Sequence, residues 1–262
     1  MIRIDDEDDP RIAAYRDIRE KDLVGRQGHF IAEGEVVLNV LARSRTCEAV
    51  SALIAEQRAE KLAPLLQTLG CPVYLAGQGV LDRVAGFHLH RGILALGRRK
   101  PGPGAADLLT GLPDKALVLA LHGIANHDNM GGLFRNAAAF GVDAVILDAT
   151  SCDPLYRKAI RVSVGGVLQV PFARTDGDLA DLLLSQGFEV LALTPAGAME
   201  LKAVRAAARS AVLLGAEGPG LPATLIAKAK GVRVAMAGGF DSLNVATTAG
   251  IVLHHLRSNP TG

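Results

Sequence analysis

The chain has 262 residues, of which 49% are apolar, and its 28 Lys and Arg residues nearly balance its 27 Asp and Glu residues. This length allows one large domain or two smaller ones, and the balanced charge means that nucleic-acid binding would require local clusters of basic residues. The three scattered cysteines argue against a disulfide or zinc framework, no apolar run approaches the ~20 residues of a membrane helix, and the acidic N-terminus is unlike a signal peptide. These features predict a cytoplasmic protein without a membrane segment.

The first half of the chain predicts a small domain. Residues 1–28 are charged and are expected to form an N-terminal extension with a short helix over 12–21. Residues 29–100 alternate between strand and helix patterns, which predicts a small α/β domain. Pro and Gly interrupt the periodicity over 101–114, where we place a linker. The expected strands of the small domain cover 29–33, 48–55, 72–76 and 92–97, and its expected helices cover 35–43, 56–69 and 78–84.

The second half, 115–262, alternates more regularly. Its continuous apolar runs are typical of strands that are covered on both faces. Such alternation predicts an α/β domain with a parallel sheet and helices on both faces. The expected strands cover 117–122, 144–147, 170–173, 189–193, 211–215 and 232–235. The expected helices cover 132–140, 154–169, 178–186, 199–208 and 222–230.

The last predicted element, within 238–256, has an unusual composition. Two glycines form a turn, and Asp241 or Ser242 is expected to cap the helix that follows. The residues over 246–250 are all small, so other backbone can approach this helix closely. The start of a helix presents free N–H groups that suit an anionic or carboxylate-bearing ligand, although a capped, buried helix would show the same pattern.

Three loops of the second half combine glycines with polar side chains. In an open parallel sheet, ligands bind beyond the carboxyl ends of the strands, where loops 126–136, 215–221 and 238–244 are expected. Each loop alone is a weak signal. The sequence has no phosphate-loop or dinucleotide fingerprint and no nucleophile elbow. The histidines lack the spacing of metal ligands, so no metal site is expected.

Taken together, the three loops resemble the three motifs of the SpoU/TrmH family of RNA methyltransferases, in the SPOUT superfamily. The resemblance covers about 115–257, and 29–100 resembles the family's substrate-binding domain more weakly. It implies a C-terminal SPOUT domain with a deep trefoil knot, S-adenosylmethionine as methyl donor, a homodimer, and methylation of a ribose 2′-hydroxyl without a metal. The motifs are Asn129-x-Gly131-x-x-x-Arg135, Gly215-x-Glu217-Gly218-x-Gly220-Leu221 and Ser242-Leu243-Asn244-Val245.

The resemblance also assigns site residues by position. The positions that match the family's active site are Asn129, Arg135, Glu217, Ser242 and Asn244. The positions that match its donor-binding residues are Gly215, Val234 and Leu243, with Met236 close by. Two departures are Asn136, where the family often has Thr, and Ala235, where it usually has Pro. The missing Pro frees a backbone N–H and bears on donor affinity rather than on the reaction.

The chemistry of methyl transfer suggests roles for these residues. Arginine keeps its proton in proteins, so we expect Arg135 to hold the adjacent phosphate and to stabilise the developing alkoxide rather than to act as a base. Asn129, Ser242 and Asn244 are expected to orient the ribose and the arginine, and Glu217 is expected to fix the loop geometry.

A group of basic residues could bind the RNA. One predicted helix carries three basic residues at positions i, i+1 and i+4, which are Arg157, Lys158 and Arg161. They could neutralise phosphates of the RNA, although an ordinary solvated helix face has the same composition. The expected partner is ribosomal RNA, because the N-terminal domain resembles those of family members that act there, with transfer RNA second. Two alternatives remain open: a catalytically silent RNA-binding or ribosome-assembly factor on the same fold, and a base methyltransferase.

Overall fold

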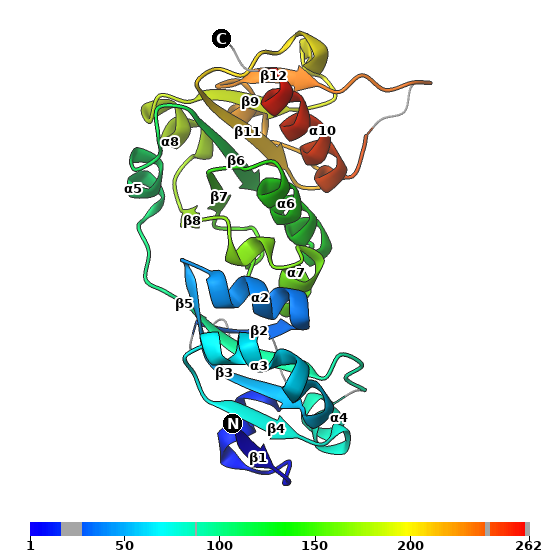
Figure 1. Ribbon diagram of the computed structural model, residues 1–262. Helices are drawn as coiled ribbons and strands as arrows, with labels where there is room; N and C mark the ends of the chain where they lie inside the picture. Colours follow the sequence, from blue (N-terminus) through cyan, green and yellow to red (C-terminus); the bar gives the residue numbers. More distant parts are fainter. Residues whose placement is uncertain (17–27, 87, 239–241, 260–262) are drawn as a thin grey trace. The chain divides into compact units, whose positions relative to one another are not determined.

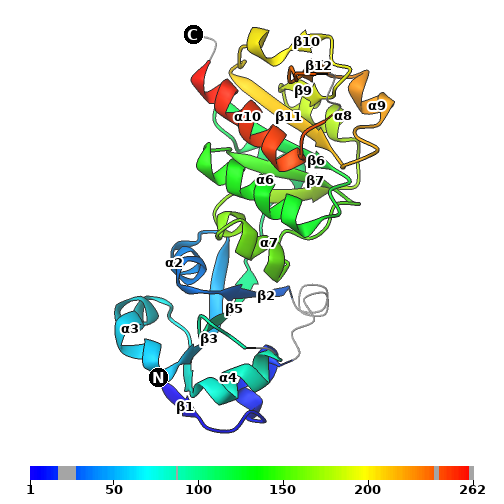
Figure 2. The ribbon, with the colours of Figure 1, turned by 90° about the vertical axis from the view of Figure 1, so that its right-hand side faces the viewer.

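The computed structural model describes residues 1–16, 28–86, 88–238 and 242–259. Its contacts divide the chain into two compact units (Figure 1, Figure 2). The first unit contains 1–101 and 155–169, and the second contains 102–154 and 170–262. The segment 155–169, which the sequence analysis placed in the C-terminal domain, therefore packs with the first unit.

The first unit is built around a five-stranded mixed sheet. Its order is β1-β4-β3-β5-β2, with β1, β4 and β3 parallel and with β5 antiparallel to both of its neighbours. The strands are β1 (Ile2–Ile4), β2 (His29–Glu33), β3 (Cys47–Ala55), β4 (Val73–Ala76) and β5 (Ile93–Arg99). The helices are α2 (Glu35–Arg43), α3 (Ala59–Thr68), α4 (Gln78–Ala85) and α7 (Arg157–Val162), with 3-10 turns at Pro10–Tyr15, Glu56–Arg58 and Gly166–Leu168.

The N-terminal residues belong to the core of this unit and do not form a peripheral extension. The buried hydroxyl of Tyr15 lies 2.7 Å from the Ser51 hydroxyl and accepts a hydrogen bond of 3.2 Å from the Leu96 backbone N–H. The short helix expected over 12–21 is instead the 3-10 turn Pro10–Tyr15, and the remainder of that prediction, 17–27, lies outside the described residues.

The second unit contains a seven-stranded sheet in which all strands are parallel, as predicted. Its order is β10-β12-β9-β11-β6-β7-β8. The strands are β6 (Ala116–His122), β7 (Ala144–Asp148), β8 (Phe172–Thr175), β9 (Glu189–Leu193), β10 (Met199–Glu200), β11 (Arg209–Gly215) and β12 (Lys230–Arg233). The helices are α5 (Ala105–Thr110), α6 (His127–Ala139), α8 (Leu179–Ser185), α9 (Ala223–Ile226) and α10 (Val245–Ser258), with a 3-10 turn at Leu201–Ala203.

Helices cover both faces of this sheet, which accounts for the continuous apolar strands. Side chains of α5 and α8 pack with the strands in one buried core. On the other face, α6 and α10 lie side by side (Figure 1, Figure 2). A Cβ atom built on Gly132 of α6 would lie 2.7 Å from the Cβ of Ala246 on α10, so the small residues at the start of α10 do allow a close approach.

Other predictions of secondary structure were also wrong. Residues 199–208 were expected to be helical, but Met199 and Glu200 pair with β12 as β10, and only a 3-10 turn follows. The expected helix over 154–169 is divided into α7 and a 3-10 turn by Val164, whose φ of 54° stops the helix. The segment 101–114 contains α5 rather than linker alone. None of the helices in the described part of the chain is long and apolar enough to cross a membrane.

Candidate functional site

The strand order of the second unit identifies where a ligand would bind. From β6 the chain proceeds to β7 and β8 on one side, whereas β11 and β9 lie on the other side of β6. The sheet therefore has its topological switch point between β6 and β11, and ligands of open parallel sheets bind at the carboxyl ends of the strands at such a point. The loops that follow β6 and β11 contain the first and second motifs of the sequence analysis.

Asn244 connects all three motifs by hydrogen bonds. Its Nδ2 donates to Oδ1 of Asn129 at 2.8 Å and to Oε1 of Glu217 at 2.7 Å. Its Oδ1 accepts from the backbone N–H groups of Ala246 and Thr247 at 2.9 and 3.2 Å and so caps α10. The Asn244 side chain thus fixes the start of α10 and holds an amide and a carboxylate from two other loops in place.

The capping residue of α10 was predicted incorrectly. Asn244, and not Ser242, is the N-cap, because α10 begins at Val245 and the Asn244 side chain accepts hydrogen bonds from the free N–H groups of its first turn. Ser242 is exposed and lines the cavity described below. Asp241, the other candidate, lies outside the described residues.

Asn129 is positioned by the start of α6. The side chain of Asn126 accepts hydrogen bonds from the N–H groups of Asp128 and Asn129, and this cap starts the helix at His127 rather than at residue 132 as predicted. Asn129 is 7% exposed, and its buried amide oxygen finds a partner in Asn244. A buried polar side chain with a specific partner orients that partner as well as itself.

Asn136 accounts for one departure from the family pattern. Its Nδ2 donates to the backbone carbonyl of Ala246 at 2.6 Å. A Cβ atom built on Gly250 would lie 3.3 Å from the Asn136 side chain. Asn136 therefore packs α6 against α10 directly behind Asn244.

A cavity of about 310 Å³ lies beside these motifs, within the range of small-molecule sites. All four residues that were predicted to bind the methyl donor line it: Gly215, Val234, Met236 and Leu243. Three predicted active-site residues also line it: Glu217, Ser242 and Asn244. Three further lining residues, Gly218, Gly220 and Val245, belong to the motifs but were given no role. The lining residues that the sequence analysis missed are Leu193, Thr194, Pro195, Leu214, Ala216, Val232 and Thr248.

Backbone geometry shapes the second motif. A Cβ atom on Gly215 would come within 2.4 Å of the carbonyl carbon of Gly220, so only glycine fits at this strand end. The N–H of Gly220 donates to the carbonyl of Ala216 at 3.1 Å and closes the loop. Gly218 and Gly220 have φ values of 88° and 68°, which favour glycine. The loop thus presents backbone and the Glu217 side chain at the cavity.

Arg135 does not lie in the cluster around Asn244. It is exposed on α6, beyond Asn129, and is not among the described residues that line the cavity. A long, exposed guanidinium at this position is free to meet a ligand that projects from the cavity.

The three basic residues of the predicted RNA patch differ in their surroundings. Arg157 pairs with Glu33 of β2 through Nε at 3.0 Å and Nη2 at 2.7 Å, and the two side chains are only 14% and 11% exposed. This pair fixes α7 on β2 and argues against Arg157 as a phosphate contact. Lys158 and Arg161 are exposed on α7.

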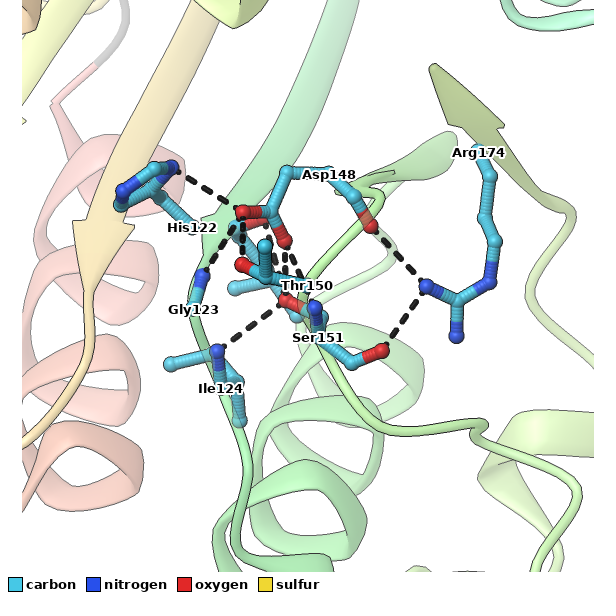
Figure 3. Close-up of polar contacts among 8 residues, drawn as sticks. His122, Gly123, Ile124, Asp148, Thr150, Ser151 and Arg174 are labelled. Carbon is cyan, nitrogen blue, oxygen red and sulfur yellow. Dashed lines mark hydrogen bonds and ion pairs between the residues drawn. The ribbon is translucent and has the colours of Figure 1, made fainter. Parts of the chain in front are cut away.

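A buried carboxylate at the end of β7 was missed by the sequence analysis (Figure 3). Asp148 accepts hydrogen bonds from the N–H of Gly123 at 3.1 Å, from the Thr150 hydroxyl at 2.5 Å, and from the Ser151 N–H and hydroxyl at 2.9 and 2.6 Å. It also pairs with Nδ1 of His122 at 3.1 Å. Burial raises the pKa of Asp148, but the hydrogen bonds outweigh this effect and leave the pKa below its ordinary value.

Arg174 of β8 braces the same loop. Its Nη1 donates to the carbonyl oxygens of Asp148 and Ser151 at 2.9 and 2.8 Å (Figure 3). Its Nη2 donates to the carbonyl of Cys152 at 2.9 Å. The signal in the sequence was a titratable residue, first His122 and then Asp148, at the carboxyl end of each of two consecutive apolar strands. Among the described residues, no group of three or more His, Cys, Asp and Glu side chains is arranged to hold a metal ion.

Known proteins resemble this chain in sequence and in fold. Residues 116–254 match the SpoU rRNA Methylase family. The chain is 41% identical over 260 residues to a Mycobacterium bovis protein named uncharacterized tRNA/rRNA methyltransferase Mb0905, covering 95% of this chain and 89% of that protein. It is 31% identical over 206 residues to the 23S rRNA (guanosine-2′-O-)-methyltransferase RlmB of Acinetobacter baylyi, covering 76% and 83%. The fold superposes on an AdoMet-bound rRNA methyltransferase from Sinorhizobium meliloti with a TM-score of 0.82, at 23% identity over 98% of this chain and 97% of that one.

Proposed function

From the fact that this chain belongs to the SpoU rRNA methylase family, as its three motifs predicted, we propose that it is an RNA methyltransferase that uses S-adenosylmethionine to methylate a ribose 2′-hydroxyl. The observation that carries the proposal is the hydrogen-bonded cluster of Asn129, Glu217 and Asn244 beside the cavity. Three loops distant in sequence supply one side chain each. If Asn244 served only to cap α10, its hydrogen bonds to Asn129 and Glu217 would not be needed.

The cavity fits the methyl donor. Its lining offers apolar side chains to an adenine ring and polar groups to an amino acid, and its carboxylate, Glu217, suits a cationic sulfonium. The glycine loop 215–220 allows backbone N–H and C=O groups to approach a ligand closely. We assign Gly215, Val234, Met236 and Leu243 to donor binding. When bound, the donor supplies an electrophilic methyl group, which requires in-line attack by the ribose oxygen.

This chain's own residues then position the nucleophile. Asn244 and Asn129 fix one another and Glu217, so that the polar edge of the cavity is organised before RNA arrives. Ser242 provides a hydroxyl at the same edge. The exposed fork of Arg135 holds the neighbouring phosphate and stabilises negative charge that develops on the ribose oxygen. Much of the rate acceleration comes from this positioning.

Ribosomal RNA is the proposed substrate, with transfer RNA second, since the similar RlmB proteins are named for 23S rRNA and the Mycobacterium bovis relative for both RNAs. The first unit, whose residues 29–100 resemble the family's substrate-binding domain, is proposed to contact the RNA, with Lys158 and Arg161 among its contacts. Their exposed charges can each neutralise a phosphate.

Two structural properties of the family are proposed for this chain as well. The first is a deep trefoil knot, with the last helix threaded through a loop, which the close packing of α10 on α6 supports. The second is a homodimer, which the resemblance to the family implies. Light scattering after gel filtration tests the dimer.

A methyl-transfer assay tests the function. Purified protein is incubated with radiolabelled S-adenosylmethionine and RNA from cells that lack it, and donor binding is measured separately by calorimetry. Label in RNA, with the adjacent phosphodiester resistant to alkali, is the expected result. Donor binding without transfer would favour a silent RNA-binding factor, and an alkali-sensitive labelled product would indicate a base methyltransferase.

A further inference from the structure

His122 and Asp148 form a pair at the carboxyl edge of the sheet of the second unit. Each is the last residue of its strand, β6 and β7, and His122 Nδ1 lies 3.1 Å from Asp148 Oδ2 (Figure 3). The carboxylate is 10% exposed and the imidazole 30%. The carboxylate is thus buried, while the imidazole reaches solvent at the edge where the ligand site lies.

The position of His122 relates the pair to the proposed site. In the β6–β11 ladder, His122 is the partner of Gly215, which lines the cavity and begins the second motif. These two residues are therefore adjacent at the switch point of the sheet, with Glu217 two residues beyond Gly215. No other strand pair ends at both the first and the second motif.

The pair has the chemistry of a base with its orienting group. A carboxylate at Nδ1 fixes the proton of the neutral imidazole on that nitrogen and leaves Nε2 as the acceptor. Asp148 itself is held by hydrogen bonds from Gly123, Thr150 and Ser151, so its orientation does not depend on His122. If Asp148 served only to hold this loop, these hydrogen bonds would suffice and the contact with the His122 imidazole would not be needed.

We propose that His122 accepts the proton of the reacting ribose hydroxyl, directly or through one water, and that Asp148 is its positioning residue. This inference rests on the proposed function and assigns a role that Arg135 cannot fill, because arginine keeps its proton. A proton acceptor must lie within hydrogen-bond reach of the hydroxyl or one water away from it, and an imidazole is the side chain best suited near neutral pH.

The step balances in atoms and charge. As the ribose oxygen forms a bond to the methyl carbon, the carbon–sulfur bond breaks and its electron pair remains on sulfur. The hydroxyl proton passes to Nε2 of His122, and the resulting imidazolium lies against the Asp148 carboxylate until solvent removes the proton. The charged side chains on the two strands paired with β6 are Asp148 on β7 and Arg209 on β11, and Arg209 lies at the opposite end of the ladder beside Ala116. Glu217 follows β11, and Arg174 of the next strand, β8, binds backbone carbonyls. The Asp148 carboxylate, which is in contact with the ring, stabilises the imidazolium.

The first test compares His122→Gln with wild type. We expect the rate of methyl transfer to fall by about 10²- to 10⁴-fold, the usual contribution of a general base, with donor affinity unchanged by calorimetry. His254→Gln, the same change on exposed α10, is the matched control and should keep the wild-type rate. A His122→Gln rate within threefold of wild type would overturn the inference.

The second test measures the protonation of the His122 imidazole directly. The pKa of the His122 imidazole is measured by NMR in the protein without donor or RNA and compared with the acidic limb of kcat/KM, which reports the free enzyme. We expect the two values to agree, and both to move to lower pH together in Asp148→Asn, because the stabilising carboxylate is lost. Disagreement in wild type, which requires no variant to fold, would refute the role.

The two proposals fail in different ways. If the wild-type protein transfers no methyl group to any RNA, the proposed function is wrong. If the wild type is active and His122→Gln is equally active, only the role of His122 is wrong.

Discussion

Replacing Asn244 by Asp tests whether its amide holds the three motifs together. The two side chains have the same shape, and Asp caps a helix about as well as Asn, so the capping oxygen is retained. The change removes the Nδ2 donor and places a carboxylate oxygen where Glu217 Oε1 is now 2.7 Å away. The Asn129 carbonyl oxygen at 2.8 Å also loses its donor.

The expected cost follows from these contacts. Two unit charges about 3 Å apart repel by roughly 1.5 kcal/mol in a water-like dielectric. The lost hydrogen bonds add about 1 kcal/mol, mostly at Asn129, which is buried and left unsatisfied. We therefore expect a loss of about 2.5 kcal/mol at pH 7 for Asn244→Asp. Asn244→Ala should lose a similar amount, since the cap contributes about 1 kcal/mol and the hydrogen bonds the rest.

The pH dependence separates these two variants. Repulsion raises the folded-state pKa of the new carboxyl pair above its unfolded value, so the pair is neutral and harmless at acidic pH and destabilising once pH rises through the folded pKa. Asn244→Asp should lose the repulsive part of its deficit as pH falls toward 4, whereas the deficit of Asn244→Ala should stay constant.

Urea unfolding at several pH values is the assay, with methyl donor binding measured alongside. Asn126→Asp, the same substitution at the cap of α6, is the matched control and should change stability by less than about 0.5 kcal/mol. An Asn244→Asp protein that is as stable as wild type at pH 7, or a deficit that does not shrink in acid, would show that the amide does not hold Glu217 and Asn129.

Four further predictions concern separate features of the chain. Arg135→Ala should abolish methyl transfer with donor binding retained, and near-normal turnover would remove Arg135 from the mechanism. Arg157→Ala should lower the free energy of unfolding by about 3 kcal/mol, because Glu33 is left buried and unpaired; unchanged urea unfolding would contradict this. Asp148→Asn should reduce stability at neutral pH. The difference from wild type should disappear below about pH 4, because the wild-type carboxylate, whose folded pKa is depressed, becomes protonated there. An equal difference at pH 3 and pH 7 would show that the charge of Asp148 does not cause the effect. Val164→Gly should stabilise the protein by about 0.5–1 kcal/mol, since release of the strain at φ 54° exceeds the flexibility that glycine adds to the unfolded chain, and a lower midpoint in urea would refute it.

The parts of the fold that could be predicted are those that local pattern determines. Strands such as 211–215 were found because a short, continuous apolar run bounded by turn residues is typical of a buried strand, and β11 covers Arg209–Gly215. Residues 199–208 were predicted wrongly because MELKAVRAAA has high helix propensity, and only pairing with β12 at the sheet edge makes Met199 and Glu200 a strand. The helix propensity of a segment carries no information about its pairing with a strand that is distant in sequence.

The site shows the same division between local and long-range information. Motif resemblance identified Asn129, Glu217 and Asn244, but it assigned Asn244 to orienting the ribose, whereas its hydrogen bonds show that it also caps α10 and holds the other two. The pair His122–Asp148 could not be found from spacing, because 26 residues separate the two and only the β6–β7 register brings their side chains together. Charged residues that end buried strands are the pattern to examine in such sheets.

The cap at Asn244 also shows how side chains from three loops can be held together at the edge of the cavity. An organised cluster must not depend on the ligand for its geometry, since ordering three loops on binding would oppose affinity. Here the first turn of α10 fixes Asn244, and Asn136 and the Gly132–Ala246 contact fix α10 on α6, the helix that bears Asn129. Substitutions at these packing residues should therefore weaken catalysis without touching any ligand: Gly132→Ala forces a Cβ to within 2.7 Å of Ala246 and should lower the methyl-transfer rate in proportion to its effect on the α6–α10 distance. A Gly132→Ala protein with a normal rate and a measurably wider helix pair would show that Asn244 keeps its partners without this support.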